Sequence, residues 1–181
     1  MTRDDLERLR GLDIDFGPIG LFQDGAGDFA YFCTPLEAEY VGRTGCDGVH
    51  FILLPGDERV FCVDPAMGEP GTYVLPVAED LRQFLSFVLF CGDTNPIAQI
   101  RWLTQERLRG MLEEDAAVRE RGELSGYFAK RDAALAAIGE SFQLAAAEPY
   151  ERIKALQAVF DQSVLDFSNE YYETLDLERP Q

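Results

Sequence analysis

The stretch GVHFILLPGDERVFCV, residues 48–63, decides the fold. It contains two apolar runs, residues 48–54 and residues 59–63, on either side of the tetrapeptide Pro55-Gly56-Asp57-Glu58. Two short runs rich in β-branched and aromatic residues around a Pro-Gly turn predict a β-hairpin. Both runs are apolar at consecutive positions, not at alternate ones, which indicates strands that are covered on both faces.

The segments on either side of this hairpin extend the sheet. Residues 72–77 (TYVLPV) predict a third strand, in which Pro76 is confined to a sheet edge because it has no N–H to donate. Upstream, the aromatic-rich residues 28–33 (DFAYFC) predict another strand, followed by a loop over residues 34–47. Downstream, apolar residues recur with helical spacing and predict an amphipathic helix over residues 78–90.

The rest of the chain is expected to be mainly helical. Two helical stretches, residues 123–147 and 149–172, are split near Pro149 and predict an α-hairpin. The sequence therefore predicts an α+β fold, with a mixed, mainly antiparallel sheet of about four to six strands, helices packed on it and a C-terminal α-helical hairpin. We expect residues 1–120 to form the α+β domain and residues 121–181 to form a C-terminal helical extension.

Negative charge dominates the composition. The chain has 33 acidic and 16 basic residues and a formal net charge of −17, a balance that repels nucleic acid and anionic membranes and attracts basic partners. The excess is greatest in residues 24–69, where nine acidic residues accompany only Arg43 and Arg59. We expect this stretch to bind a basic protein, although solubility alone is an alternative explanation. The candidate partner-binding residues are Asp24, Asp28, Glu37, Glu39, Asp47, Asp57 and Glu58.

Residues suited to catalysis or cofactor binding form no recognisable pattern. The four cysteines include no C-x-x-C pair, and the only histidine, His50, lies within an apolar run, so we expect no metal site and a buried, hydrogen-bonded histidine. Gly25-Ala26-Gly27 lacks the third glycine and the lysine of a phosphate-binding loop, which favours a tight turn. We expect no catalytic residue and no cofactor. Without an apolar signal segment or a bilayer-length apolar run, we expect a cytoplasmic protein.

Three segments share a further pattern with a known family. They are Cys46–Phe51 (CDGVHF), Val60–Pro65 (VFCVDP) and Val77–Leu81 (VAEDL), the last followed by the pair Phe84-Leu85. A hairpin that ends in V-F-x-V-D-P and leads to a helix with an F-L pair resembles the SUKH superfamily, which contains bacterial immunity proteins related to a yeast regulator of cell-wall synthesis. The resemblance implies an α+β fold and a protein that binds and neutralises a secreted toxin, often a nuclease. It implies no catalytic residues.

Three functional hypotheses follow. The first is a non-catalytic immunity protein that neutralises a basic bacterial toxin, with a nuclease domain as the expected partner, since nuclease toxins are usually basic. The second is a regulatory or scaffold module that binds partner proteins through residues 123–181. The third is an enzyme, for which the sequence offers no set of nucleophile, base and orienting group.

Overall fold

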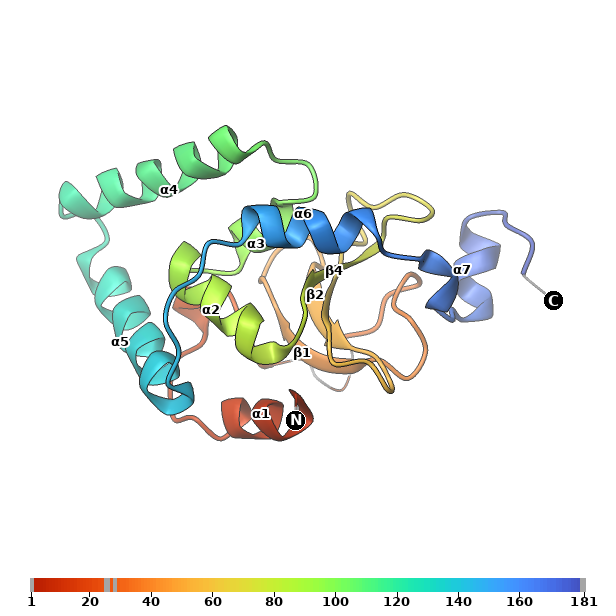
Figure 1. Ribbon diagram of the computed structural model, residues 1–181, viewed down its shortest axis with the longest axis horizontal. Helices are drawn as coiled ribbons and strands as arrows, with labels where there is room; N and C mark the ends of the chain where they lie inside the picture. Colours follow the sequence, from red (N-terminus) through yellow and green to blue (C-terminus); the bar gives the residue numbers. More distant parts are fainter. Residues whose placement is uncertain (1, 25–26, 28, 180–181) are drawn as a thin grey trace.

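Figure 1 shows the protein as a computed structural model, which describes residues 2–24, 27 and 29–179. The strands are β1 (Glu39–Arg43), β2 (His50–Leu53), β3 (Val60–Val63) and β4 (Val74–Ala78). The α-helices are α1 (Thr2–Arg10), α2 (Leu81–Cys91), α3 (Asn95–Gln99), α4 (Gln105–Glu120), α5 (Ser125–Phe142), α6 (Tyr150–Ala158) and α7 (Asn169–Thr174). Two 3₁₀ helices, η1 (Gly17–Ile19) and η2 (Gln162–Val164), complete the described elements. The combination of a sheet with α-helices confirms the expected α+β class.

The four strands form one sheet in the order β1-β2-β3-β4. All of its strand pairs are antiparallel, so the sheet described is not mixed and lies at the lower end of the expected size. The predicted hairpin is confirmed as β2 and β3, with His50 opposite Val63 and Leu53 opposite Val60. This register places the connections β1–β2 and β3–β4 at one end of the sheet and the β2–β3 turn at the other.

Both faces of the sheet are buried, as the unbroken apolar runs predict. Because successive side chains of a strand point to opposite faces, Phe51 and Cys62 lie on one face and Ile52 and Phe61 on the other. The first face packs against the apolar sides of α1, α2, α5 and α6 in the larger core. The second face packs in a smaller core with the segment around Phe167 and α7, which lies at the far end of the molecule from α4 and α5 in Figure 1.

The outer edge of β4 is covered by the chain that follows α5. Helix α6 packs along β4, and the Gln157 side chain donates to the Pro76 carbonyl at 3.3 Å. Just beyond α6, the Gln162 side chain donates to the Val74 carbonyl at 3.0 Å. These amides replace the hydrogen bonds that a fifth strand would make, which protects the edge from pairing with another chain.

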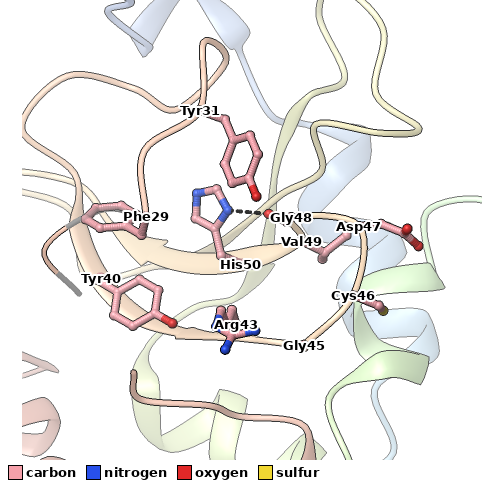
Figure 2. Close-up of a pocket in the computed structure, with 10 residues that line it drawn as sticks. All are labelled: Phe29, Tyr31, Tyr40, Arg43, Gly45, Cys46, Asp47, Gly48, Val49 and His50. Carbon is pink, nitrogen blue, oxygen red and sulfur yellow. Dashed lines mark hydrogen bonds between the residues drawn. The ribbon is translucent and has the colours of Figure 1, made fainter. Parts of the chain in front are cut away.

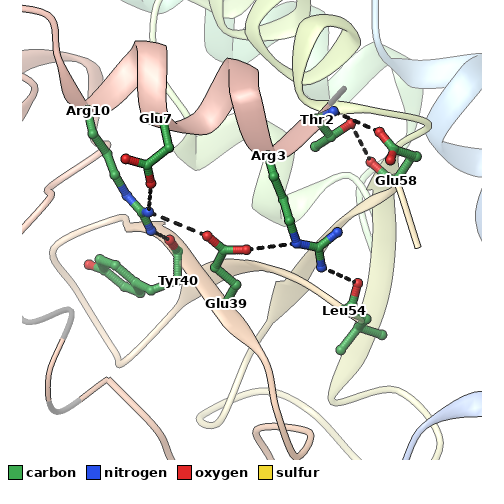
Figure 3. A network of polar contacts seen from close by, with 8 residues as sticks. All are labelled: Thr2, Arg3, Glu7, Arg10, Glu39, Tyr40, Leu54 and Glu58. Carbon is green, nitrogen blue, oxygen red and sulfur yellow. Dashed lines mark hydrogen bonds and ion pairs between the residues drawn. The ribbon is translucent and has the colours of Figure 1, made fainter. Parts of the chain in front are cut away.

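The outer edge of β1 is covered in the same way from the N-terminal segment. The Arg10 guanidinium donates to the Tyr40 carbonyl at 2.6 Å, and the Gln23 amide donates to the Val41 carbonyl at 2.9 Å. Figure 3 shows that α1 presents its polar side to this part of the sheet. Side chains therefore occupy carbonyls on both outer strands.

Two strand predictions differ from the structure. Residues 29–33 are not a strand, because their aromatic rings serve packing: Phe29 lies against Tyr40, with ring centroids 4.9 Å apart. The first strand instead lies at residues 39–43, within the expected loop. In the sequence, Gly42 favours a loop. In the structure it allows the Leu21 side chain to approach the backbone of β1 closely, because a Cβ atom at Gly42 would lie 2.6 Å from Leu21 Cδ1.

The expected pairing of two long C-terminal helices also differs from the structure. The stretch 149–172 is divided into α6, η2 and α7, and α6 packs on β4 while α5 packs on η1 and α2. Ile138 and Phe142 of α5 and Ile153 of α6 belong to the same core as α1 and α2. The boundary expected after residue 120 is thus crossed by the main core.

Replacing both Gln157 and Gln162 by alanine is expected to lower the free energy of unfolding by about 1–2 kcal/mol, because two carbonyls of β4 lose their donors. The exposed strand edge is also expected to promote self-association. Urea denaturation and analytical ultracentrifugation measure the two effects, and Gln105→Ala, at an exposed position that opens α4, serves as the matched control. A double variant that is as stable as this control, and that self-associates no more than it, would contradict the role of the two glutamines in protecting the edge of β4.

Candidate functional site

The connection between β1 and β2, residues 44–49, is held in an unusual backbone conformation. Gly45, Asp47 and Gly48 have φ angles of 90°, 52° and 70°, in the left-handed region that favours glycine. The glycines are also required by space, because a Cβ atom would lie 2.6 Å from the Phe22 ring at Gly45 and 2.5 Å from the Tyr31 ring at Gly48. Aromatic rings packed on both glycines fix the position of the loop.

A first pocket, of about 250 Å³, lies on one side of this loop. Figure 2 shows the His50 ring beside Tyr31, with Tyr40 and Arg43 on the other side and Cys46 and Asp47 pointing away from the imidazole. The Tyr31 and His50 rings stack with centroids 5.8 Å apart. Tyr31 remains 48% exposed, so it forms the outer wall of the pocket.

His50 is a fully engaged structural residue. Its Nδ1–H donates to the Gly48 carbonyl at 2.7 Å, and since a carbonyl only accepts, Nε2 must accept from the Thr34 hydroxyl at 3.2 Å. Burial lowers the pKa of His50, against the opposing effect of the Gly48 carbonyl. The expected buried, hydrogen-bonded histidine is confirmed. Cys62 lies on the opposite face of the sheet, so it forms no catalytic pair with His50.

A second pocket, of about 290 Å³, lies on the other side of the same loop. Its walls come from residues 44–49, from the β3–β4 connection and from α3 with the turn that follows it. Two large side chains stand exposed on its rim: Met67 is 66% exposed and Trp102 is 42% exposed. Together with Tyr31, they place three large exposed side chains around one rigid loop that carries Asp47.

The segments behind the second pocket are tied together by Arg101. Its guanidinium donates to the Thr72 carbonyl at 2.6 Å and to the Met67 carbonyl at 3.0 Å, and it stacks on the Trp102 ring with 4.2 Å between Cζ and the ring centroid. The Asp64 carboxylate accepts from the Met67 N–H at 2.8 Å. The exposed side chains of Met67 and Trp102 thus sit on a backbone that is already held in place.

Four of the candidate acidic residues are engaged within the protein. Figure 3 shows α1 bound to two of them: Arg3 and Arg10 contact Glu39 at 3.1 and 3.4 Å, and the Thr2 N–H donates to Glu58 at 2.8 Å. Asp57 forms an ion pair with Arg59 at 2.6 Å, and Asp24 forms one with Arg43 at 2.8 Å. Much of the acidity near α1 is therefore compensated internally.

The structure does not bring the whole candidate set together. Glu39, Asp57 and Glu58 belong to one end of the sheet, whereas Asp47 and the Asp24–Arg43 pair lie towards the other end, around the loop 44–49. Glu37 is exposed, with a φ of 56°. Asp28 lies outside the described residues. Of the described residues in the set, only Asp47 lines both pockets.

Sequence reasoning missed Tyr31, Met67 and Trp102. Each of these residues comes from a different part of the chain. The register of the sheet and the position of α3 bring them together around residues 44–49. The only local signal was the pair of glycines at Gly45 and Gly48 flanking Asp47, which is typical of a tightly constrained turn.

Other types of site have little support in the part of the chain that the structure describes. Among those residues, no group of three or more histidine, cysteine or acidic side chains is arranged to hold a metal ion. None of the described helices combines the length and apolarity required to cross a bilayer. No family model, curated protein or solved structure matches the chain. The resemblance to the SUKH superfamily therefore stays a prediction.

A Gly48→Ala substitution is expected to cost more stability than Gly56→Ala, although both glycines have a φ near 70°. Gly56 has open space around its Cα, so alanine there adds only backbone strain of about 1–2 kcal/mol. Alanine at Gly48 would also displace the Tyr31 ring, adding about 1–3 kcal/mol. Urea denaturation of both variants measures the difference, and equal costs would show that Tyr31 does not brace the loop.

Lowering the pH below 6.5 is expected to weaken the fold through His50. Its folded-state pKa lies below the ordinary value of 6.5, so the unfolded chain binds a proton first and stability falls as the pH drops, by at most about 1.4 kcal/mol per pH unit. The stability advantage over His50→Asn, which keeps a donor towards Gly48, should therefore shrink between pH 7 and pH 5. NMR titration of His50, the single histidine of the chain, measures its folded-state pKa. A pKa at or above 6.5 would contradict the prediction.

Proposed function

We propose that the protein is a non-catalytic binding protein that neutralises a basic bacterial toxin, with a nuclease domain as the partner class. The observation that carries the proposal is the rigid surface around residues 44–49, where Tyr31, Met67 and Trp102 stand exposed beside Asp47 in a chain of net charge −17. Large aromatic and methionine side chains on a preorganised surface are typical of residues that dominate binding energy.

Electrostatics supports a basic partner over other ligands. Excess negative charge accelerates association with a positively charged protein and disfavours nucleic acid or anionic lipid. The resemblance of the β2–β3 hairpin and α2 to the SUKH superfamily supports the toxin as the kind of partner. The satisfied hydrogen bonds of His50 argue against a general base at the first pocket, because both ring nitrogens are already occupied.

A regulatory or scaffold module is the second candidate. The observation that favours it is the exposed apolar segment between α6 and α7, where Val159 is 81% exposed and Val164 is 59% exposed. Deletion of residues 123–181 does not separate the two candidates, because α5 and α6 supply Ile138, Phe142 and Ile153 to the core. Point substitutions are required instead.

The test is binding of the purified chain to the basic toxin domain encoded beside its gene. We expect inhibition of the toxin, and an association rate that falls about tenfold or more between about 0.05 and about 0.5 M salt. Met67→Ala and Trp102→Ala are each expected to cost about 1–4 kcal/mol of binding free energy, whereas Val159→Ala should change it by less than about 0.5 kcal/mol. Calorimetry and stopped-flow fluorescence measure these quantities.

Two results would count against the proposal. The absence of a complex with the neighbouring toxin would remove the toxin-neutralising function. A toxin complex weakened by Val159→Ala but unaffected by Met67→Ala and Trp102→Ala would place the binding surface at the segment between α6 and α7, and would remove the observation on which the proposal rests.

A further inference from the structure

The second pocket combines an apolar wall with carboxylates. Trp102, Met67 and Ala98 supply the apolar part, while Asp47 and Asp64 supply carboxylate groups and Asn95 and Gln99 supply amides. Asp64 is only 3% exposed, so its charge acts from within the wall of the pocket, where it is less screened than a surface charge. The pocket thus offers both a surface for an alkyl stem and acceptors for a cationic head.

The positive charges near the pocket are already engaged. None of the ten residues that line it is basic. The neighbouring guanidinium, that of Arg101, donates to two backbone carbonyls, stacks on Trp102 and interacts electrostatically with Asp64. It therefore supports the wall and offsets part of the Asp64 charge, which leaves Asp47 as the main carboxylate for a cationic ligand. An anionic ligand would face two carboxylates. A purely apolar ligand would remove the exposed Asp47 carboxylate from water, which is costly.

We propose that this pocket receives an arginine side chain presented on the surface of a basic protein. The stem of that side chain would lie against Met67 and Trp102, and its guanidinium would pair with Asp47 at the rim and approach Asp64 in the wall. Arginine suits this combination because its planar group stacks on aromatic rings and binds carboxylates through paired donors. The inference rests on the proposed function, since it names the chemistry by which the same surface recognises its partner.

The pocket can be tested without the partner by using a blocked Gly-Arg-Gly peptide. Trp102 is the only tryptophan of the chain, so its fluorescence and its indole N–H NMR signal report on the pocket. We expect a saturable change with the arginine peptide, and binding that is roughly fivefold or more weaker for the isosteric but neutral citrulline peptide. Lysine and leucine peptides separate a general cation site and a general apolar site from an arginine site.

Matched substitutions locate the effect. Asp47→Asn removes the rim charge while keeping a residue that tolerates the φ of 52°, and it should weaken binding of the arginine peptide roughly fivefold. Glu37→Gln removes an exposed charge that does not line the pocket, and it should leave binding unchanged. Circular dichroism confirms that both variants are folded.

The inference is overturned if Trp102 shows no saturable change, or if the citrulline, lysine or leucine peptide binds as tightly as the arginine peptide. These outcomes are distinct from failure of the proposed function. If the peptide fails but the toxin complex still forms, only the arginine pocket is refuted. If the arginine peptide binds as expected but no toxin complex forms, the pocket stands as a recognition site for a different basic protein.

Discussion

A four-stranded sheet that is buried on both faces depends on how the hydrogen-bonding groups of its two outer strands are satisfied. Here glutamine and arginine side chains provide part of that satisfaction: Gln157 and Gln162 reach β4, and Arg10 and Gln23 reach β1. The backbone of Phe22 also pairs with that of Arg43 at the end of β1. Because the faces are covered by apolar packing and several edge carbonyls are occupied by these donors, strand addition is a disfavoured route to partner binding. The proposed binding function would then depend on the connections at the ends of the sheet.

The antiparallel register gathers the proposed binding surface at one end of the sheet. It brings the β1–β2 and β3–β4 connections together at the same end, next to α3 and the turn that follows it. Aromatic rings packed on Gly45 and Gly48 fix the first connection, and Arg101 fixes the second. In the proposed complex little ordering of these connections would remain to be done, so more of the contact energy would be available for affinity. At the opposite end, α1 compensates Glu39 and Glu58.

The sequence predicts best the elements whose causes are local. The hairpin of β2 and β3 follows from two apolar runs and a turn, and α2 follows from the spacing of its apolar residues. The structure adds an N-terminal cap to α2, in which the Asp80 side chain accepts from the Gln83 N–H at 2.7 Å. Prediction from sequence fails where a residue type is required by a contact with a distant part of the chain. Gly42 resembles a strand breaker but allows contact with Leu21, and the aromatic residues near Phe29 resemble a strand but pack as a cover. Apart from the glycines at Gly45 and Gly48, the surface around Trp102 has no sequence signature, because three separate segments build it.

The cover of β4 also has a consequence for synthesis on the ribosome. The whole sheet, residues 39–78, leaves the exit tunnel well before α6 at residues 150–158, so a nascent chain carries a complete but unprotected strand edge while some seventy residues are still being added. During that interval, pairing between neighbouring nascent chains on a polysome competes with correct folding. The pace of translation across residues 79–150 is therefore expected to influence the yield of native protein, in addition to the stability of the finished fold.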